Sequence, residues 1–368
     1  MLPGVIYILI PATLTFVIGM LITPIVTRYL YKHKAWKKRA GKIALDGSEA
    51  EVFNGLHKDQ EVRAPRMGGV VIWGSVVITT LVLVIINVLF PSPQTDMLSF
   101  LSRSQTWIPL TTLIVGAIAG LFDDLLTIRP GGSGLRHAEA GSGLAKAGLA
   151  LRWRLGIVIG LSFIIGVWFY DKLDVTAINI PFVAPLEIGW LIIPFFILVS
   201  LALFASGVID GIDGLSGGVF ASIFSSYTII AYIEGQNDLA AFCATIVGGI
   251  LAFLWFNIPP ARFYMTDTGT MALTLTLGVV ALMTDTLGGG YGIAVLPVIG
   301  GLLVITVLSN IAQVLSKKFL HKKIFLVAPL HHHFEAIGWP GYKVVMRYWI
   351  LSVIFAFAGV ILALAALG

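Results

Sequence analysis

The stretch "GVVIWGSVVITTLVLVIINVLF", residues 69–90, contains no charged side chain. An α-helix crosses the hydrocarbon core of a bilayer with about 20 apolar residues, so this run is long enough to span it. Working outward, comparable apolar runs lie at 5–30, 107–122, 155–170, 188–206, 217–233, 240–256, 271–284, 292–315 and 346–367. The sequence therefore predicts an all-α integral membrane protein with about ten transmembrane helices, forming a single polytopic domain over 1–368.

The composition agrees with a membrane protein. Hydrophobic residues make up 57% of the chain, charged residues only 12%, and the mean hydropathy is +0.94. This much apolar surface excludes an ordinary soluble fold. The first run has no basic residue ahead of it and is too long for the core of a signal peptide, so we expect it to be retained. The single cysteine, Cys243, can form no intramolecular disulfide.

The basic residues predict how the helices are oriented, because Lys and Arg favour the cytoplasmic side of a membrane. If the ten runs alternate across the bilayer, the connections after odd-numbered runs all lie on one side of it. That side holds all but two of the 24 lysines and arginines. Both termini are therefore expected to be extracytoplasmic, and 31–67, 123–154 and 316–345 to be cytoplasmic loops. The same side holds all seven histidines and twelve of the nineteen acidic residues, which predicts an active site at the cytoplasmic face.

Three acidic segments stand at junctions between apolar runs and these connections: "GLFDDLLTIR" (120–129), "ASGVIDGIDGLSGG" (205–218) and "FNIPPARFYMTDTGTMAL" (256–273). Carboxylates at this depth are costly unless they are paired, hydrated or bound to metal. The adjacent Asp123 and Asp124 could be a hydrated helix end. Taken together, however, several carboxylates with almost no cysteine nearby favour a hard cation, Mg²⁺ or Mn²⁺, over zinc.

The second segment places Asp210 and Asp213 three residues apart among glycines. This spacing puts both carboxylates either on one helical face or inside one tight turn. Glycines permit close approach of the backbone to a ligand. A helix break or a calcium-like loop is the alternative, although the further ligands of an EF-hand are missing.

The segment "APLHHHFEAIGW" (328–339) sets three histidines in a row, flanked by Lys322, Lys323, Lys343 and Arg347. Three consecutive side chains cannot all point at one ion from regular structure, which disfavours a zinc site. Histidines beside cations are suited to binding phosphate. The alternative is that this segment is only an amphipathic surface loop. Phosphoryl transfer needs a metal, positioned cations and a base, so the sequence predicts transfer of a phosphorylated compound to a lipid.

The four segments "GLFDDLL", "DGIDGLSGG", "FNIPPARFYMTDTG" and "PLHHHFE", in this order, resemble the polyprenyl-phosphate N-acetylhexosamine-1-phosphate transferase family. The histidine segment resembles the branch that acts on UDP-MurNAc-pentapeptide. The resemblance implies a ten-helix protein of the bacterial inner membrane that makes lipid I from this nucleotide and undecaprenyl phosphate, releases UMP and takes part in peptidoglycan synthesis. It also implies homodimerisation.

By the family pattern, Asp267 would bind Mg²⁺, with Mn²⁺ as an alternative, and Asp123 would activate the lipid phosphate with support from Asp124. Asp210 would lie beside the pyrophosphate, and His331 would complete the catalytic group. The resemblance also implies a set of substrate-binding residues: Gly211, Ile212, Asp213, Asn257, Tyr264, Arg154, Lys58, His332 and His333.

Several positions depart from the pattern. The family usually has a lysine where this chain has Thr127, and Arg129 is the nearby residue that we expect to replace it. Three further departures are Gly207, Ile209 and Thr266, and 130–147 resembles an insert. These departures remove polar partners from the site but leave its carboxylates.

Two other functions remain open. The nearest is a sister transferase that uses UDP-GlcNAc. The other is a non-catalytic relative or a transporter with acids for ion coupling, although no inverted repeat is apparent. A nucleic-acid partner is not expected despite the pI of about 9.2, because the membrane topology and anionic headgroups account for the positive charge.

Overall fold

The computed structural model describes residues 2–36, 54–55, 64–102, 105–128 and 148–367. Within these ranges, ten helices are long and apolar enough to cross a membrane, which confirms the predicted number. Their main elements are α1 (Leu2–Lys32), α3 (Val70–Leu89), α5 (Trp107–Ile128), α6 (Leu151–Lys172), α7 (Ile192–Ser206), α8 (Leu215–Ile233), α9 (Asn237–Asn257), α10 (Thr266–Met283), α12 (Gly301–Leu315) and α14 (Gly341–Leu367), and the spans of α7 and α12 continue into adjoining short helices.

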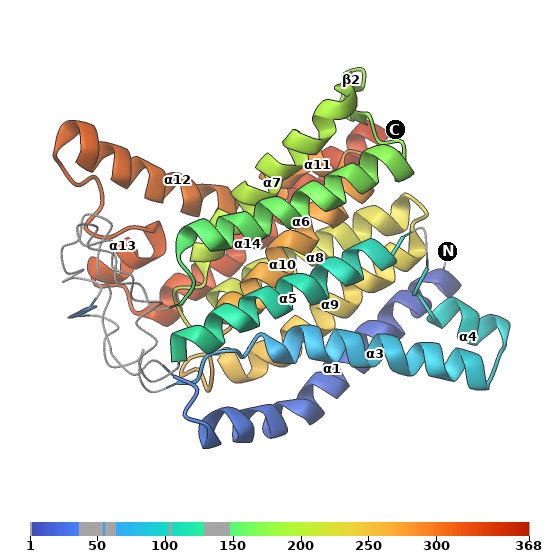
Figure 1. The fold of residues 1–368 in the computed structure, drawn as a ribbon, viewed down its shortest axis with the longest axis horizontal. Coiled ribbons are helices and arrows are strands. Elements are labelled where there is room, and N and C mark those ends of the chain that lie inside the picture. The colour runs from blue at the N-terminus through green and yellow to red at the C-terminus, as the bar shows by residue number, and fades with distance from the viewer. Residues whose placement is uncertain (1, 37–53, 56–63, 103–104, 129–147, 368) are drawn as a thin grey trace.

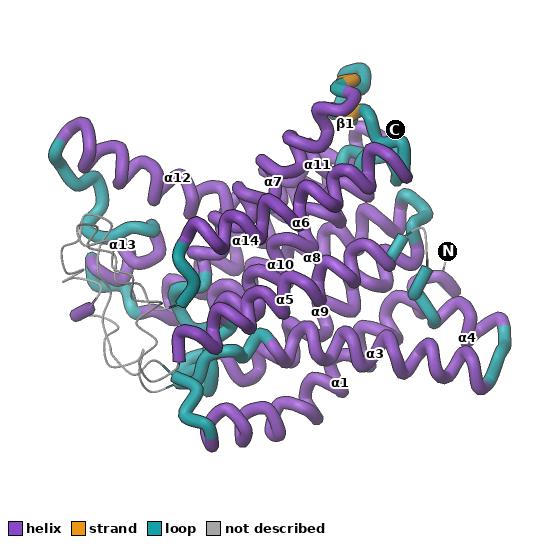
Figure 2. The backbone as a smooth tube through the Cα atoms, viewed as in Figure 1, coloured by secondary structure: helices purple, strands orange, loops and turns teal. Residues whose placement is uncertain are grey.

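Shorter elements join these helices. They are α4 (Pro93–Leu98), β1 (Ala177–Ile178), β2 (Leu186–Glu187), η1 (Gly189–Leu191), η2 (Gly207–Ile209), α11 (Gly292–Ile299), η3 (Ser316–Leu320) and α13 (Leu330–Ala336). The two strands form an antiparallel hairpin, and Figure 2 shows the remaining described chain as helices and loops. The chain is therefore a mostly helical, multi-pass membrane protein.

The predicted run 292–315 is not one helix, and this prediction was wrong. Pro297 lies inside α11 and has no N–H to give to the carbonyl one turn earlier. Gly300 then takes φ −87° and ψ 24°, which is not helical, and separates α11 from α12. The eight residues of α11 are too short to cross a bilayer, so the ninth spanning helix begins at Gly301. In Figure 1, α12 points away from the rest of the bundle.

Helix α10 lies at the centre of the bundle and packs against α3, α5, α7, α8 and α11. Its closest neighbour is α5, which carries glycines where the two helices touch. A Cβ added at Gly116 would lie 3.0 Å from the carbonyl oxygen of Met271, and one added at Gly120 would collide with the carbonyl of Asp267. Small residues let helix backbones approach closely. This contact sets the last turn of α5 beside the first turn of α10.

Both termini lie at the end of the bundle opposite α13 (Figure 1). The last turns of α5, α7 and α9 meet the first turns of α6, α8 and α10 at the α13 end. The acidic and histidine segments therefore gather at one end of the molecule.

Candidate active site

Three carboxylates from two helices form the centre of the site. Carboxylate oxygens of Asp123, Asp124 and Asp267 all lie within 4.8 Å of one another. Asp123 and Asp124 come from α5 and are fully buried, while the Asp267 side chain, in the first turn of α10, is 22% exposed. The interpretation of Asp123 and Asp124 as a hydrated helix end is therefore wrong. A carboxylate in the first turn of α10 also has a favourable interaction with the helix dipole.

Asp124 is surrounded by donors. Its Oδ1 accepts from Nε of Arg66 at 3.1 Å and from Nη2 at 2.8 Å. Its Oδ2 accepts from the hydroxyl of Thr266 at 2.5 Å, and from the N–H and hydroxyl of Thr268 at 3.0 and 2.6 Å. A carboxylate has about four acceptor positions. These five contacts fill them, so Asp124 orients its neighbours and has no lone pair left for a metal or substrate.

Asp123 and Asp267 share one guanidinium group. Nη2 of Arg154 lies 2.5 Å from Oδ2 of Asp123, and Nη1 lies 3.3 Å from Oδ2 of Asp267. The backbone N–H of Leu149 donates to Oδ1 of Asp123 at 2.6 Å. Arg154 thus stands between the two acids.

Thr266 joins the triad to the glycine-rich loop. It takes the left-handed backbone conformation with φ +54°, which is costly for a residue with a Cβ and which glycine adopts freely. Its hydroxyl donates to Asp124 and accepts from the N–H of Met67 at 3.0 Å. Its own N–H donates to Oδ2 of Asp210 at 2.9 Å. The departure at position 266 therefore supplies a bridging hydroxyl.

Asp210 follows the short turn η2, and its second oxygen accepts from Ser216 at 2.7 Å. Burial raises the pKa of the Asp210 carboxyl, against the hydrogen bonds from Ser216 and Thr266, which lower it. Gly207 and Ile209 form η2 itself, and Ile209 is fully buried, so neither supplies a polar side chain to the site.

The loop after Asp210 is a tight turn, one of the two arrangements predicted for DGIDG. Asn257 holds it by accepting from the N–H of Gly214 at 2.9 Å and donating to the carbonyl of Phe263 at 2.8 Å. Asp213 accepts from the N–H of Ala261 at 3.0 Å, and Ile212 is partly buried. The two segments that lead into α8 and α10 are thereby fixed to one another.

The three histidines separate on α13. Nε2 of His331 and Nε2 of His332 both face Gly211, where an added Cβ would lie 2.5 and 2.7 Å from them. Nδ1 of His332 pairs with Glu335 at 2.8 Å. His333 instead accepts from the N–H of Leu326 at 3.2 Å within its own loop. The structure therefore brings His331 and His332 to the Asp210 loop and does not bring His333 there.

The arrangement has relatives among known proteins. A family profile described as Glycosyl transferase family 4 matches residues 106–285. A phospho-N-acetylmuramoyl-pentapeptide-transferase of Geobacillus sp. (strain WCH70) is 31% identical over 352 residues, 94% of this chain and 95% of the relative. Proteins of the same name from Rickettsia massiliae (strain Mtu5) and Moorella thermoacetica are 34% and 32% identical over 96% of this chain and 90% and 97% of the relatives. The chain belongs to the phospho-N-acetylmuramoyl-pentapeptide-transferase family. This confirms the resemblance drawn from the four segments.

The carboxylate oxygens of the triad formed by Asp123, Asp124 and Asp267 fit a hard divalent cation. Every ligand atom is a carboxylate oxygen, and oxygen ligands are those that Mg²⁺ prefers. Because Asp124 is filled by hydrogen bonds, Asp123 and Asp267 are the residues that would hold such an ion. Arg154, which already bridges these two acids, shows that the position attracts positive charge.

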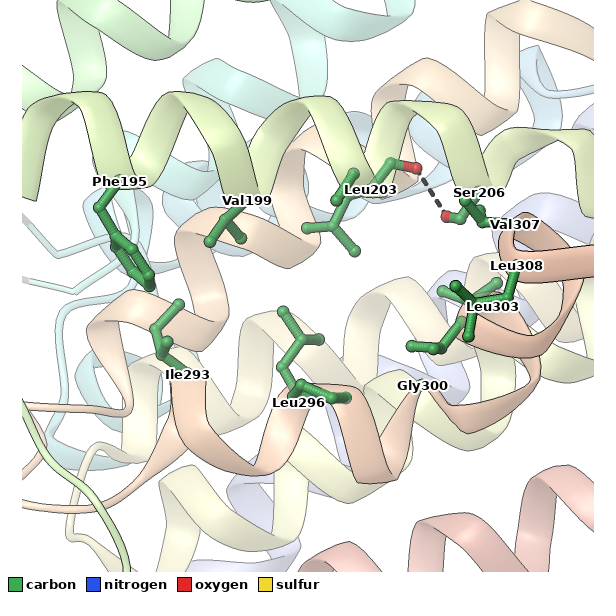
Figure 3. A pocket seen from close by; sticks show the side chains of 13 residues that line it. Phe195, Val199, Leu203, Ser206, Ile293, Leu296, Gly300, Leu303, Val307 and Leu308 are labelled. Atoms are coloured by element: carbon green, nitrogen blue, oxygen red, sulfur yellow. Dashed lines mark hydrogen bonds between the residues drawn. The ribbon is translucent and has the colours of Figure 1, made fainter. Parts of the chain in front are cut away.

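An apolar cavity of about 410 Å³ lies between α7, α11 and α12 (Figure 3). At one end it is bounded by Phe195 and Ile293, and at the other by Leu308 and Ser206, which is four residues before Asp210. The break between α11 and α12 contributes Gly300 to its lining. The lining is almost entirely hydrocarbon, so the cavity suits an aliphatic chain whose polar end lies near the Asp210 loop.

Sequence reasoning missed Arg66, in the segment "APRMGG" (64–69), as a site residue. No local signal marks it, because its partner Asp124 is 58 positions away. Tyr264 lies in the segment that pairs with this stretch, with its N–H donating to the carbonyl of Pro65 at 2.8 Å. Lys58, Arg129 and the insert 130–147 lie outside the described residues.

Proposed function

We propose that this chain transfers phospho-MurNAc-pentapeptide from UDP-MurNAc-pentapeptide to undecaprenyl phosphate, forming lipid I and UMP. The observation that carries the proposal is that the carboxylate triad, the Asp210 loop and two histidines meet at one end of the bundle, next to an apolar cavity. A water-soluble nucleotide reaches such a site from the loop side, and a prenyl chain reaches it from the bilayer.

In this reaction an oxygen of the lipid phosphate attacks the phosphorus that carries the sugar. A new P–O bond forms, the bond to the oxygen that bridges toward uridine breaks, and UMP leaves with that oxygen. Asp123 would activate the lipid phosphate, and its ion pair with Arg154 supports this role. Asp124 holds Thr266 and Thr268 and so orients the first turn of α10.

Mg²⁺, with Mn²⁺ as an alternative, would neutralise phosphate charge when held by Asp267 and Asp123. Asp210 would lie beside the pyrophosphate, and Arg154 would contact phosphate oxygens. His331 and His332, which face Gly211, would contact the sugar phosphate. His333 and Lys58 remain proposed as substrate-binding residues.

The uridine would be bound by Gly211, Ile212, Asp213 and Asn257, with the aromatic ring of Tyr264 stacking on the base. Asn257 joins the Asp210 loop, through Gly214, to the neighbouring segment, through Phe263, which supports a common role for these residues. We further propose that the site faces the cytoplasm of a bacterial inner membrane, with both termini outside, and that the protein acts as a homodimer.

The test is release of UMP by the purified protein from UDP-MurNAc-pentapeptide and undecaprenyl phosphate, with and without Mg²⁺, and with UDP-GlcNAc as the competing nucleotide. Asp267→Asn should abolish release. Asp171→Asn, which changes an exposed carboxylate paired with Lys172, is the matched control and should leave it unchanged. Equal turnover of UDP-GlcNAc, or UMP release that does not depend on a divalent ion, would contradict the proposal.

A further inference from the structure

The positive charge of the site is divided between two arginines. In the described part of the chain, the guanidinium groups of Arg154 and Arg66 are those that lie within salt-bridge distance of the triad. Arg154 contacts Asp123 and Asp267, whereas Arg66 contacts Asp124. Three carboxylates this close repel one another unless cations stand beside them. Each guanidinium therefore offsets the negative charge of a different part of the triad.

Arg66 is held in position by the backbone on both sides of it. Its own N–H donates to the carbonyl of Ala35 at 2.7 Å. The next residues pair with the segment that leads into α10: the N–H of Met67 donates to Thr266, and the N–H of Gly68 donates to the carbonyl of Tyr264 at 2.8 Å. The side chain is only 18% exposed. The guanidinium is thus fixed against Asp124 and loses little further freedom in holding it.

Burial and the neighbouring carboxylates shift the pKa of Arg66 in opposite directions. Burial lowers the pKa of the guanidinium, but the nearby charges of Asp124, Asp267 and Asp123 outweigh it, and the pKa is raised. Arg66 is consequently a permanent positive charge at the edge of the triad.

Position 127 of α5 borders the same carboxylates and carries no charge. The hydroxyl of Thr127 donates back to the carbonyl of Asp123 at 3.0 Å within its own helix, and the residue is buried. A Cβ added at Gly148 would lie 2.7 Å from this hydroxyl and 2.9 Å from Oδ1 of Asp123, so all three meet at one point. A lysine at 127, the residue that the family resemblance leads one to expect, would bring its ammonium group to the triad from α5.

We propose that Arg66 is a positioning residue of this site and supplies, from the loop before α3, the positive charge that position 127 lacks. By occupying Asp124, Arg66 leaves Asp123 and Asp267 as the two acids open to a divalent cation and a phosphate. The activity measurement that tests this inference rests on the proposed transferase reaction. The measurement of metal binding does not depend on that reaction.

The experiment compares Arg66→Met, Arg66→Lys, Thr127→Lys and the double variant Arg66→Thr/Thr127→Lys with the unchanged protein. Arg28→Met, which removes an exposed arginine from the end of α1, is the matched control. UMP release gives kcat and KM, and titration with Mn²⁺ followed by electron paramagnetic resonance gives the affinity of the site for metal. Loss of a supporting contact that orients the acids of such a site is expected to cost about 10- to 100-fold in activity.

Arg66→Met should lower kcat by about this factor and should bind Mn²⁺ more tightly, because the triad then has one more uncompensated negative charge. The double variant should recover kcat and return Mn²⁺ affinity toward that of the unchanged protein, and Arg66→Lys should be intermediate.

A merely structural arginine would weaken activity and metal binding together, without recovery in the double variant. That result, or an Arg66→Met protein indistinguishable from Arg28→Met, would overturn the inference. If the unchanged protein releases no UMP, the proposed function fails, and the Mn²⁺ affinities still decide the role of Arg66.

Discussion

Asp124 in α5 accepts two hydrogen bonds from Thr268, 144 positions later in the chain, one from its N–H at 3.0 Å and one from its hydroxyl at 2.6 Å. Both residues are fully buried. A hydrogen bond to a buried charge is stronger than one between neutral groups, and a carboxylate that loses a donor keeps its desolvation cost. This pair therefore stabilises the contact between α5 and α10 on which the triad depends.

Replacing Thr268 by Val should consequently destabilise the protein by about 1.5–3 kcal/mol, since the isosteric side chain removes a charge-assisted hydrogen bond. The free energy of unfolding is measured by titration of the protein with SDS in mixed micelles. Thr274→Val is the control, because Thr274 is equally buried in α10 but donates to carbonyls of its own helix, those of Thr270 and Met271. Equal losses in the two variants would show that the contact with Asp124 adds nothing to stability.

The spanning helices and the members of the triad were predictable because their signals are local. Apolar runs give the helices, and Asp123, Asp124 and Asp267 each stand where an apolar run meets a charged connection. A carboxylate at such a junction needs a partner or a metal, whatever the rest of the fold. The separation of His333 from His331 was not predictable in the same way, because it depends on how α13 lies against the Gly211 turn.

The missed features depend on contacts between distant segments. Thr266 reads in the sequence as the loss of a family glycine, and only the fold shows its hydroxyl between Met67 and Asp124. Hydropathy likewise cannot distinguish one long helix over 292–315 from two helices, because the strongly apolar residues around Pro297 and Gly300 dominate the mean hydropathy of the run.

Gly211→Ala should strongly reduce UMP release. The added Cβ would lie 2.5 Å from Nε2 of His331 and 2.7 Å from Nε2 of His332, closer than carbon and nitrogen can pack, so one ring has to move. We expect a loss of about 10- to 100-fold, the range seen when supporting contacts of a site are displaced. Gly156→Ala in α6 is the control, because a Cβ there meets nothing within 4 Å, and it should leave the activity unchanged.

Glu234, in the turn between α8 and α9, should make stability depend on pH. Burial and the nearby Asp285 raise the pKa of Glu234 from 4.5 to about 8, and burial raises the pKa of Asp285 from 3.8 to about 6. Because the folded-state pKa of Glu234 is the higher one, its contribution is fully present below pH 4.5 and is lost as the pH rises through about 8.

Glu234→Gln should accordingly lose less thermal stability than the unchanged protein as the pH rises from 4.5 to about 8, the range in which the buried acid must ionise. Unfolding temperatures measured across this range give the comparison. Glu187→Gln, at an exposed position of the hairpin, should follow the unchanged protein. A Glu234→Gln profile parallel to that of the unchanged protein would mean that Glu234 is ionised in the fold throughout.

A bulky residue in the apolar cavity should affect the lipid substrate and not the nucleotide. Val199 of α7 lines the cavity, and Figure 3 places it between Phe195 and Leu203 on the same helix. Val199→Trp would fill part of the space of about 410 Å³. If a prenyl chain lies there, KM for undecaprenyl phosphate should rise about tenfold or more, since displacing a few buried methylene groups at about 0.8 kcal/mol each is sufficient. KM for UDP-MurNAc-pentapeptide should stay within about twofold, because the uridine side of the site lies beyond the Asp210 loop.

Val353→Trp, at an exposed position of α14, is the matched control and should change neither constant. A rise in both Michaelis constants would point to a distorted fold, and no change in either would place the prenyl chain elsewhere.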